Sequence, residues 1–143
     1  MKYVINLWDT AGQEKFRSLS KLFFKGSDIA ILVYDITNQE SFKNLEYWVN
    51  ALKENKNSDS KCIIGIVGNK SDKIKEQKVD ENEAINYAKS LGIKHRLVSA
   101  KIDPYSFINF LEELVKDARE NLFKKSGKIF LNMQKNKKQK CKC

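Results

Sequence analysis

Two dense apolar runs constrain the fold of this chain more than any other feature of its sequence. Residues 28–36 and 61–68 are rich in Ile, Val and Leu. Continuous apolar strands of this kind are buried on both faces, which occurs in parallel sheets covered by helices. Residues 3–8 alternate enough to form another strand, and residues 96–99 are a short fourth candidate. We therefore predict a parallel sheet with helices on both sides.

The segment after the first dense run has the signals of a helix. Thr37 and Glu40 have the spacing of a capping box, in which each side chain satisfies a backbone N–H of the first turn. Apolar residues then follow at helical spacing and are expected to pack on the sheet. They are Phe42, Leu45, Trp48, Val49 and Leu52.

Two further helices are predicted later in the chain. Asp80 with Glu83 begins one, and Gly92 supplies its C-terminal stop. Asp103 and Pro104 begin the other. Its apolar stripe is Phe107, Phe110, Leu111, Leu114, Val115, Ala118 and Leu122. The predicted order is β-β-α-β-α-β-α, an α/β fold.

Charge and composition divide the chain into two parts. Its 143 residues suit one globular domain, and of its net charge of +9, residues 124–143 carry eight lysines and no acidic residue. The remaining residues hold 19 basic and 18 acidic side chains, a net charge of +1. We predict a domain at residues 1–123 and a flexible basic tail at 124–143.

Apolar length and cysteine positions exclude other classes. No apolar run approaches the roughly 20 residues of a membrane-spanning helix, and the sequence shows no signal peptide. Cys62 opens a strand, whereas Cys141 and Cys143 lie at the C-terminus, so no disulfide framework is indicated. These features favour a reducing, cytosolic setting.

A first chemical motif is Asp9-Thr10-Ala11-Gly12-Gln13. An acid at the end of a strand can hold Mg²⁺ through water, Gly12 can offer a backbone N–H to a γ-phosphate, and Gln13 can orient an attacking water. By itself this short pattern is more often only structural, a strand that ends in a turn.

A second motif, Asn69-Lys70-Ser71-Asp72, follows the second dense run. The Asp72 carboxylate can accept hydrogen bonds from the N1–H and exocyclic amine of guanine, which adenine does not offer. The stem of Lys70 can cover the face of the base, and the Asn69 amide can tie neighbouring loops together. An isolated motif of this kind could also be a simple Asn/Asp turn.

Ser99-Ala100-Lys101 comes at the end of the next predicted strand and can add a backbone N–H for the guanine carbonyl oxygen. Alone it would carry no information. All three motifs, however, come at the carboxyl ends of predicted strands, where doubly wound sheets bind ligands. Their order and placement together predict a guanine-nucleotide site.

With these motifs, the segments at residues 8–19, 23–27 and 32–37 make the chain resemble a Rab-type small GTPase of the Ras superfamily. The resemblance implies a P-loop NTPase-like, doubly wound, mostly parallel sheet. It also implies GTP and GDP with Mg²⁺ as ligands, GTP hydrolysis, and a switch in vesicle-mediated protein transport. Exchange factors, GTPase-activating proteins and effectors are the implied partners.

The G-x-x-x-x-G-K-[ST] phosphate-binding loop of such proteins does not occur in these 143 residues. Relative to the family, the expected fold therefore lacks its first two strands and first helix, together with the first switch. The absent first strand would lie between the strands at residues 3–8 and 28–36. We expect a central gap in the sheet at that position.

The C-terminal Cys141-Lys142-Cys143 is not a C-a-a-X box, but it resembles the double geranylgeranylation signal of Rab proteins. Residues 129–131, Ile-Phe-Leu, could bind the prenylation escort. Two incidental thiols in a solvated tail, or half of a metal site, are the alternatives. Lipidation implies the cytoplasmic face of intracellular membranes, with a cytosolic pool.

Two main hypotheses follow for function. One is a prenylated Rab-like GTPase. The other is a nucleotide-free, non-catalytic interaction protein that uses its tail and its second switch, around which the segments at residues 8–19, 23–27 and 32–37 lie. Nucleic-acid binding by the lysine-rich tail is a weaker hypothesis, because aromatic residues are not interleaved with the lysines.

Overall fold

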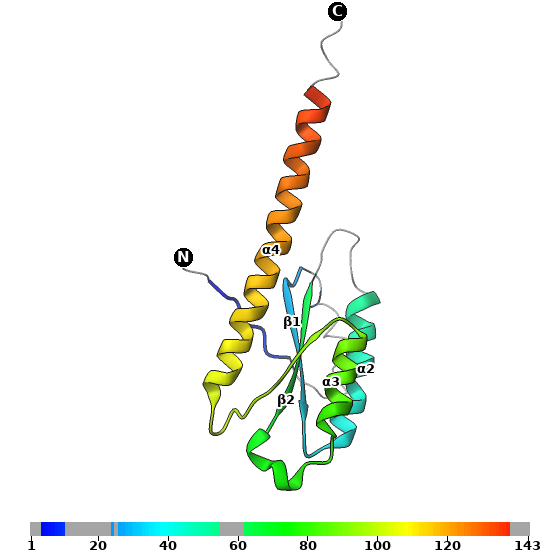
Figure 1. The fold of residues 1–143 in the computed structure, drawn as a ribbon, viewed down its shortest axis with the longest axis vertical. Helices are drawn as coiled ribbons and strands as arrows, with labels where there is room; N and C mark the ends of the chain where they lie inside the picture. The colour runs from blue at the N-terminus through cyan, green and yellow to red at the C-terminus, as the bar shows by residue number, and fades with distance from the viewer. Residues whose placement is uncertain (1–3, 11–23, 25, 55–61, 138–143) are drawn as a thin grey trace, which may run out of the picture.

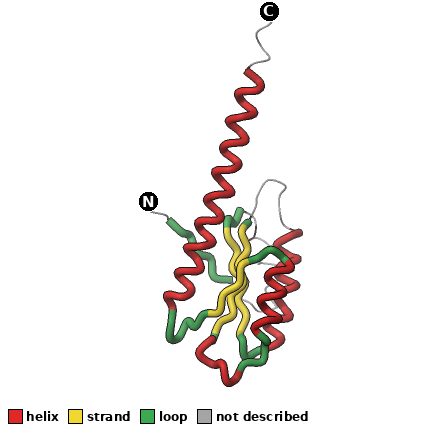
Figure 2. Tube along the Cα trace, in the orientation of Figure 1, coloured by secondary structure: helices red, strands yellow, loops and turns green. Residues whose placement is uncertain are grey.

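A computed structural model describes residues 4–10, 24, 26–54 and 62–137 of the chain. Its centre is a sheet of three parallel strands, β1 (Ile29–Asp35), β2 (Ile63–Asn69) and β3 (Lys94–Leu97), in the order β1-β2-β3 (Figures 1 and 2). The two dense apolar runs form β1 and β2, as predicted. In the β1–β2 pair the register runs from Ile29 opposite Ile63 to Asp35 opposite Asn69.

Helices cover both faces of this sheet. On one side lie α2 (Gln39–Glu54) and α3 (Glu81–Ser90), and on the other lies α4 (Pro104–Lys137) (Figure 1). A short 3-10 helix, η2 (Ser71–Glu76), connects β2 to α3. The doubly wound, mostly parallel α/β class predicted from the sequence is confirmed. None of the described helices has the length and apolar character needed to cross a membrane.

Alternate residues of the strands supply two apolar cores. Tyr34, Ile36 and Ile66 face α2 and α3, where they pack with Phe42 and Leu45 of α2. The opposite core forms under α4 and consists of Val67, Val98, Phe110 and Leu114. Both faces of β2 are buried in these cores, which explains why its sequence is apolar without interruption.

Gly65 permits α4 to approach the sheet closely. A Cβ at this position would lie 2.6 Å from Leu114 Cδ1 and 3.0 Å from Phe110 Cε1. These separations are well below the roughly 3.5–4.0 Å of a favourable carbon contact. The missing side chain thus sets the distance between α4 and β2.

The predicted strand at residues 3–8 is wrong over its described part. Residues 4–10 have no regular structure, and Val4, Leu7 and Trp8 are 90%, 74% and 72% exposed. An alternating sequence makes a strand possible, but a strand also needs a neighbour with which its backbone groups can pair. The sheet formed by β1, β2 and β3 gives residues 4–10 no such neighbour.

The fourth predicted strand is shifted toward the N-terminus. β3 covers Lys94–Leu97 instead of residues 96–99, because its pairing with β2 ends where Leu97 lies opposite Gly68. The Val98 N–H still donates to the Gly68 carbonyl, and Ser99 forms a separate bridge with Asp103. The first and last residues of β3 are therefore set by its pairing with β2. The composition of the short run does not specify this pairing.

The first predicted helix cap is also wrong in detail. The Asn38 side chain, not that of Thr37, accepts hydrogen bonds from the N–H groups of Glu40 (3.0 Å) and Ser41 (3.3 Å). The Thr37 hydroxyl instead donates to Asp35 at 2.7 Å. In contrast, Asp80 caps α3 as expected, accepting from the Glu83 N–H at 2.9 Å. Asn is at least as good an N-cap residue as Thr. Because the Thr37 hydroxyl is bound to Asp35, Asn38 becomes the cap of α2.

The last helix is longer than predicted. Its buried residues Phe110 and Leu114 belong to the expected stripe, but α4 continues past residue 123 to Lys137. Its C-terminal half extends beyond the sheet (Figure 1). Lysine, the most frequent residue in 124–137, is a good helix former, which accounts for a helix where a flexible segment was expected.

Candidate nucleotide-binding site

The candidate site lies at one edge of the sheet, where β1 and β2 end level with each other. Asp35 and Asn69 are the last residues of these strands and lie opposite each other in the parallel register. The segment 98–101 after β3 reaches the same edge, since the Ser71 N–H donates to the Val98 carbonyl at 3.0 Å. The carboxyl ends of parallel strands thus bring three loops together.

Asn69 joins two of these loops through a single oxygen. Its Oδ1 accepts from its neighbour, the Lys70 N–H, at 2.8 Å and from the Ala100 N–H at 3.1 Å. Ala100 follows β3, 31 residues further along the chain. The tie between loops that the sequence suggested for Asn69 is therefore present.

Asp72 and Ser99 form a second connection between the same loops. The Ser99 hydroxyl donates to Asp72 Oδ1 at 2.5 Å and accepts from the Ile102 N–H at 3.2 Å. Ser99 is only 1% exposed, so its hydroxyl is held in place. This hydrogen bond is the main reason that the pKa of Asp72 lies below its ordinary value. Asp72 therefore remains a charged acceptor on the rim of the site at neutral pH.

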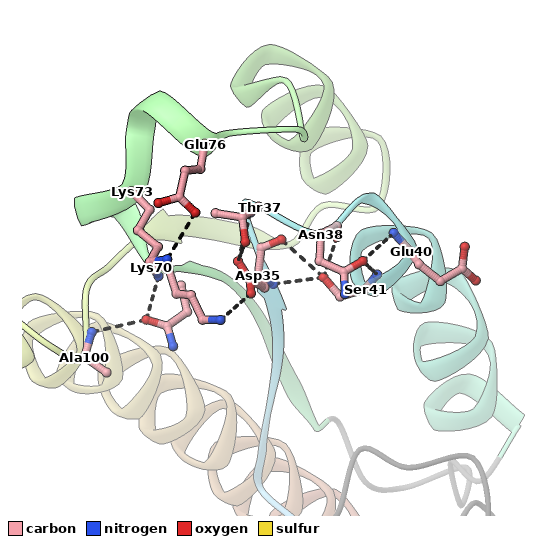
Figure 3. A network of polar contacts seen from close by, with 10 residues as sticks. Asp35, Thr37, Asn38, Glu40, Ser41, Lys70, Lys73, Glu76 and Ala100 are labelled. Atoms are coloured by element: carbon pink, nitrogen blue, oxygen red, sulfur yellow. Dashed lines mark hydrogen bonds and ion pairs between the residues drawn. The ribbon is translucent and has the colours of Figure 1, made fainter.

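Lys70 has an unusual backbone. Its φ of 67° and ψ of 36° place it in the left-handed region, the one non-glycine residue of the described chain with positive φ. This conformation costs a residue with a side chain about 1–2 kcal/mol. The Lys70 ammonium lies 2.5 Å from Asp35 Oδ2 (Figure 3). Neighbouring contacts therefore compensate for the strained backbone.

Asp35 is held from several directions. Its Oδ1 accepts from the Thr37 N–H (2.8 Å) and the Thr37 hydroxyl (2.7 Å), and the Asp35 N–H donates to Ser41 Oγ (3.0 Å). Burial disfavours the charged carboxylate, but hydrogen bonds from Lys70 and Thr37 outweigh it and hold the pKa of Asp35 below its usual value. The same contact with Asp35 raises the pKa of Lys70. The pair is ionised at neutral pH.

The structure brings together only part of the predicted site. Asn69, Lys70, Asp72, Ser99 and Ala100 form the connected group, and Lys101 is exposed next to it. Asp9 lies in the exposed segment 4–10 and is not brought into this group within the described chain. Two further predicted residues, Gly12 and Gln13, lie outside the described residues, as do Cys141 and Cys143.

Sequence reasoning missed Asp35 and Thr37. Asp35 lies near the end of the apolar run 28–36, so the rule that used strand ends to select the other motifs could have found it. Its importance depends on the parallel register, which places Asp35 opposite Asn69 and beside Lys70. The spacing along the sequence does not reveal this contact.

A model of the Ras family matches residues 1–120. The chain belongs to the Ras family. Human Rab-21 is 46% identical over 95 residues, covering 66% of this chain and 41% of the relative. Dog Rab-13 is 36% identical over 134 residues, covering 94% of this chain and 63% of the relative. This chain is therefore of the Rab type. It spans about half the length of these relatives.

Ras-family proteins bind GTP or GDP with Mg²⁺, and the described residues of this chain fit one end of that ligand. Asp72 offers a charged acceptor and Lys70 a partly exposed stem, while the Ala100 N–H of the neighbouring loop donates to Asn69. These groups suit a guanine base. The predicted Mg²⁺ ligand Asp9 lies in the exposed segment 4–10, and among the described residues no contact joins it to the connected loops, so no step involving the metal follows from this geometry.

Proposed function

We propose that this Rab-type chain acts as a guanine-nucleotide switch that binds GTP and GDP, hydrolyses GTP and serves vesicle-mediated protein transport. The observation that carries the proposal is a pair of hydrogen bonds between the loops at residues 69–72 and 99–101, which we call the base loops. One runs from Ala100 to Asn69 and the other from Ser99 to Asp72. Hydrogen bonds within the protein hold these loops together. A base can therefore bind without first ordering them.

Each residue of the base loops has a distinct proposed role. Asp72 accepts from guanine and rejects adenine, which lacks the matching donors. The stem of Lys70 covers one face of the base, and Asn69 keeps the loops together. Ser99 fixes Asp72, while Ala100 and Lys101 line the side of the guanine carbonyl.

The phosphate end is proposed from the family resemblance. Gly12 would offer its backbone N–H to the γ-phosphate, and Gln13 would orient the attacking water. Asp9 would hold Mg²⁺ through a water molecule. When bound, Mg²⁺ neutralises charge on the phosphates.

The second candidate function is that of a nucleotide-free interaction protein. The exposure of residues 4–10, which include Asp9, favours it, because an exposed Asp9 is not held in place for a metal. In this alternative, the second switch and the C-terminal segment bind partners, while the base loops only stabilise the fold.

A thermal-unfolding experiment distinguishes the two functions. One sample is the 143-residue chain, and the other, called the joined protein, carries the N-terminal segment of human Rab-21 upstream of it, including a phosphate-binding loop. A ligand that binds the native state raises the unfolding temperature. We expect GTP with Mg²⁺ to stabilise the joined protein and not the shorter chain, since the phosphates carry most of the ligand's charge. Failure of GTP to stabilise the joined protein would favour the interaction protein.

Membrane attachment is proposed through Cys141 and Cys143. Two isoprenoid chains near a lysine-rich segment anchor a protein more stably than one chain does. Helix α4 extends beyond the sheet, which would hold the domain away from the lipid (Figure 1). The location would be the cytoplasmic face of intracellular membranes, with a cytosolic pool. Exchange factors, GTPase-activating proteins, effectors and a prenylation escort would be the partners.

A further inference from the structure

Lys70 has one close acidic partner among the described residues, and this partner comes from another strand. Its Nζ lies 2.5 Å from Asp35 Oδ2, whereas the more distant acids Asp72 and Glu76 of η2 influence it only through charge. The Lys70 side chain points across the end of β2 toward β1 (Figure 3). A long lysine side chain has many rotamers in solution, so this contact selects a small subset of them.

The carboxylate of Asp35 is itself oriented before it meets Lys70. Thr37 donates twice to Oδ1, which leaves Oδ2 facing the lysine. The first turn of α2 holds the backbone of Asp35, since Ser41 Oγ accepts from its N–H at 3.0 Å and donates to the Asn38 carbonyl at 2.7 Å. A carboxylate fixed in this way can act as an anchor.

The backbone of Lys70 is fixed as well. The residue is left-handed, its N–H donates to Asn69 Oδ1, and its carbonyl accepts from the Lys73 N–H at 2.8 Å. With both ends of the side chain held, its stem has a defined path between the ends of β1 and β2. This path borders the loops assigned to the base.

We propose that Asp35 is a positioning residue for nucleotide binding, which holds the Lys70 ammonium so that the lysine stem lies ready to cover the base. The inference rests on the proposed function of the base loops and adds a residue to it. Preorganisation of this kind lowers the cost of ordering the lysine when the ligand binds. The opposite role, in which Asp35 competes with the ligand for Lys70, predicts an effect of opposite sign.

The first test measures the contact in the 143-residue chain without nucleotide. The rate at which an amine reagent acetylates Lys70 is followed by peptide mass spectrometry from neutral to strongly alkaline pH. In Asp35→Asn, we expect the midpoint of this profile to move to lower pH, because the neutral amide no longer stabilises the ammonium. In Asp35→Glu the Lys70 midpoint should lie closer to its wild-type value than in Asp35→Asn. A purely structural role for Asp35 would leave the midpoint unchanged in both variants.

Two controls accompany this test. Asp35→Asn keeps an oxygen that can accept from Thr37, so the turn after β1 is preserved. Glu76→Gln removes a carboxylate that acts on Lys70 only through charge, so it should move the Lys70 midpoint less than Asp35→Asn does. Should Asp35→Asn not fold, the pKa of Asp35 is measured by NMR in Lys70→Gln, where we expect it to rise. An unchanged Lys70 midpoint, or an unchanged Asp35 pKa in that variant, overturns the inference.

The second test measures release of fluorescently labelled GDP from the joined protein. The side chains of Lys70 and Asp35 are 50% and 23% exposed, and pairs exposed to this degree contribute modestly, so we expect release about two- to fivefold faster in Asp35→Asn. Slower release would overturn the inference and make Asp35 a competitor. If the joined protein binds no GDP, the proposed function fails, while the labelling profile still decides whether Asp35 positions Lys70.

Discussion

Gly68 offers a direct test of how the end of β2 is packed, because any side chain there would collide with the core. A Cβ at Gly68 would lie 2.6 Å from Tyr34 Oη and 2.6 Å from Leu97 Cδ2. Favourable contacts need roughly 3.5–4.0 Å. The Tyr34 hydroxyl is also hydrogen-bonded to His95 Nε2 at 3.0 Å. In Gly68→Ala, Tyr34 must therefore move and weaken this bond.

The expected loss of stability follows from these two effects. Overpacking a core costs about 1–3 kcal/mol, and loss of one hydrogen bond costs about 0.5–1.5 kcal/mol. We therefore expect Gly68→Ala to lower the free energy of unfolding by about 2–4 kcal/mol. Urea unfolding followed by circular dichroism measures this change. Because Gly68 directly precedes Asn69, displacement of the strand end should also loosen the base loops.

Gly92→Ala is the matched control. Gly92 has a φ of +65°, and no atom lies within 4 Å of the position that an alanine Cβ would take, so the substitution introduces strain without collision. The expected cost is about 1–2 kcal/mol. Adding Tyr34→Phe to Gly68→Ala removes one of the two nearest atoms, and the double variant should lose less stability than the sum of the single variants. A Gly68→Ala chain within about 0.5 kcal/mol of the wild type, the range of a neutral surface change, would refute the close approach.

Three further predictions concern recognition, pH and membrane attachment. In the joined protein, Asp72→Ala should weaken GTP binding by roughly 10- to 100-fold without improving ATP binding; an unchanged GTP dissociation constant removes Asp72 from the site. Burial lowers the pKa of His95, the single histidine, so the unfolded state binds more protons just below pH ~6.5. The free energy of unfolding should fall as the pH drops through this window, and His95→Gln should flatten the dependence in urea titrations. Changing Cys141 and Cys143 to Ser should release the protein from membranes, and an intact mass without isoprenoid in eukaryotic cells would contradict lipidation.

The sequence by itself determined the class of the fold and the composition of its base loops. The apolar runs that became β1 and β2 could be buried on both faces only in a parallel sheet covered by helices. Asn69, Asp72 and Ser99 were found because each follows a strand, and such ends share one edge of the sheet. These inferences rely on local patterns, which can be read from residues close together in the sequence.

Only the tertiary structure decided which of these patterns found partners. Residues 4–8 alternate like a strand, yet they stay exposed because strand formation requires a neighbouring backbone. Thr37 stands at the position expected for a helix cap. Its hydroxyl instead donates to Asp35, and Asn38 caps the helix. The contact between Asp35 and Lys70 joins residues far apart in the chain. Such contacts depend on register and packing, which bring distant residues together and are not encoded in local spacing.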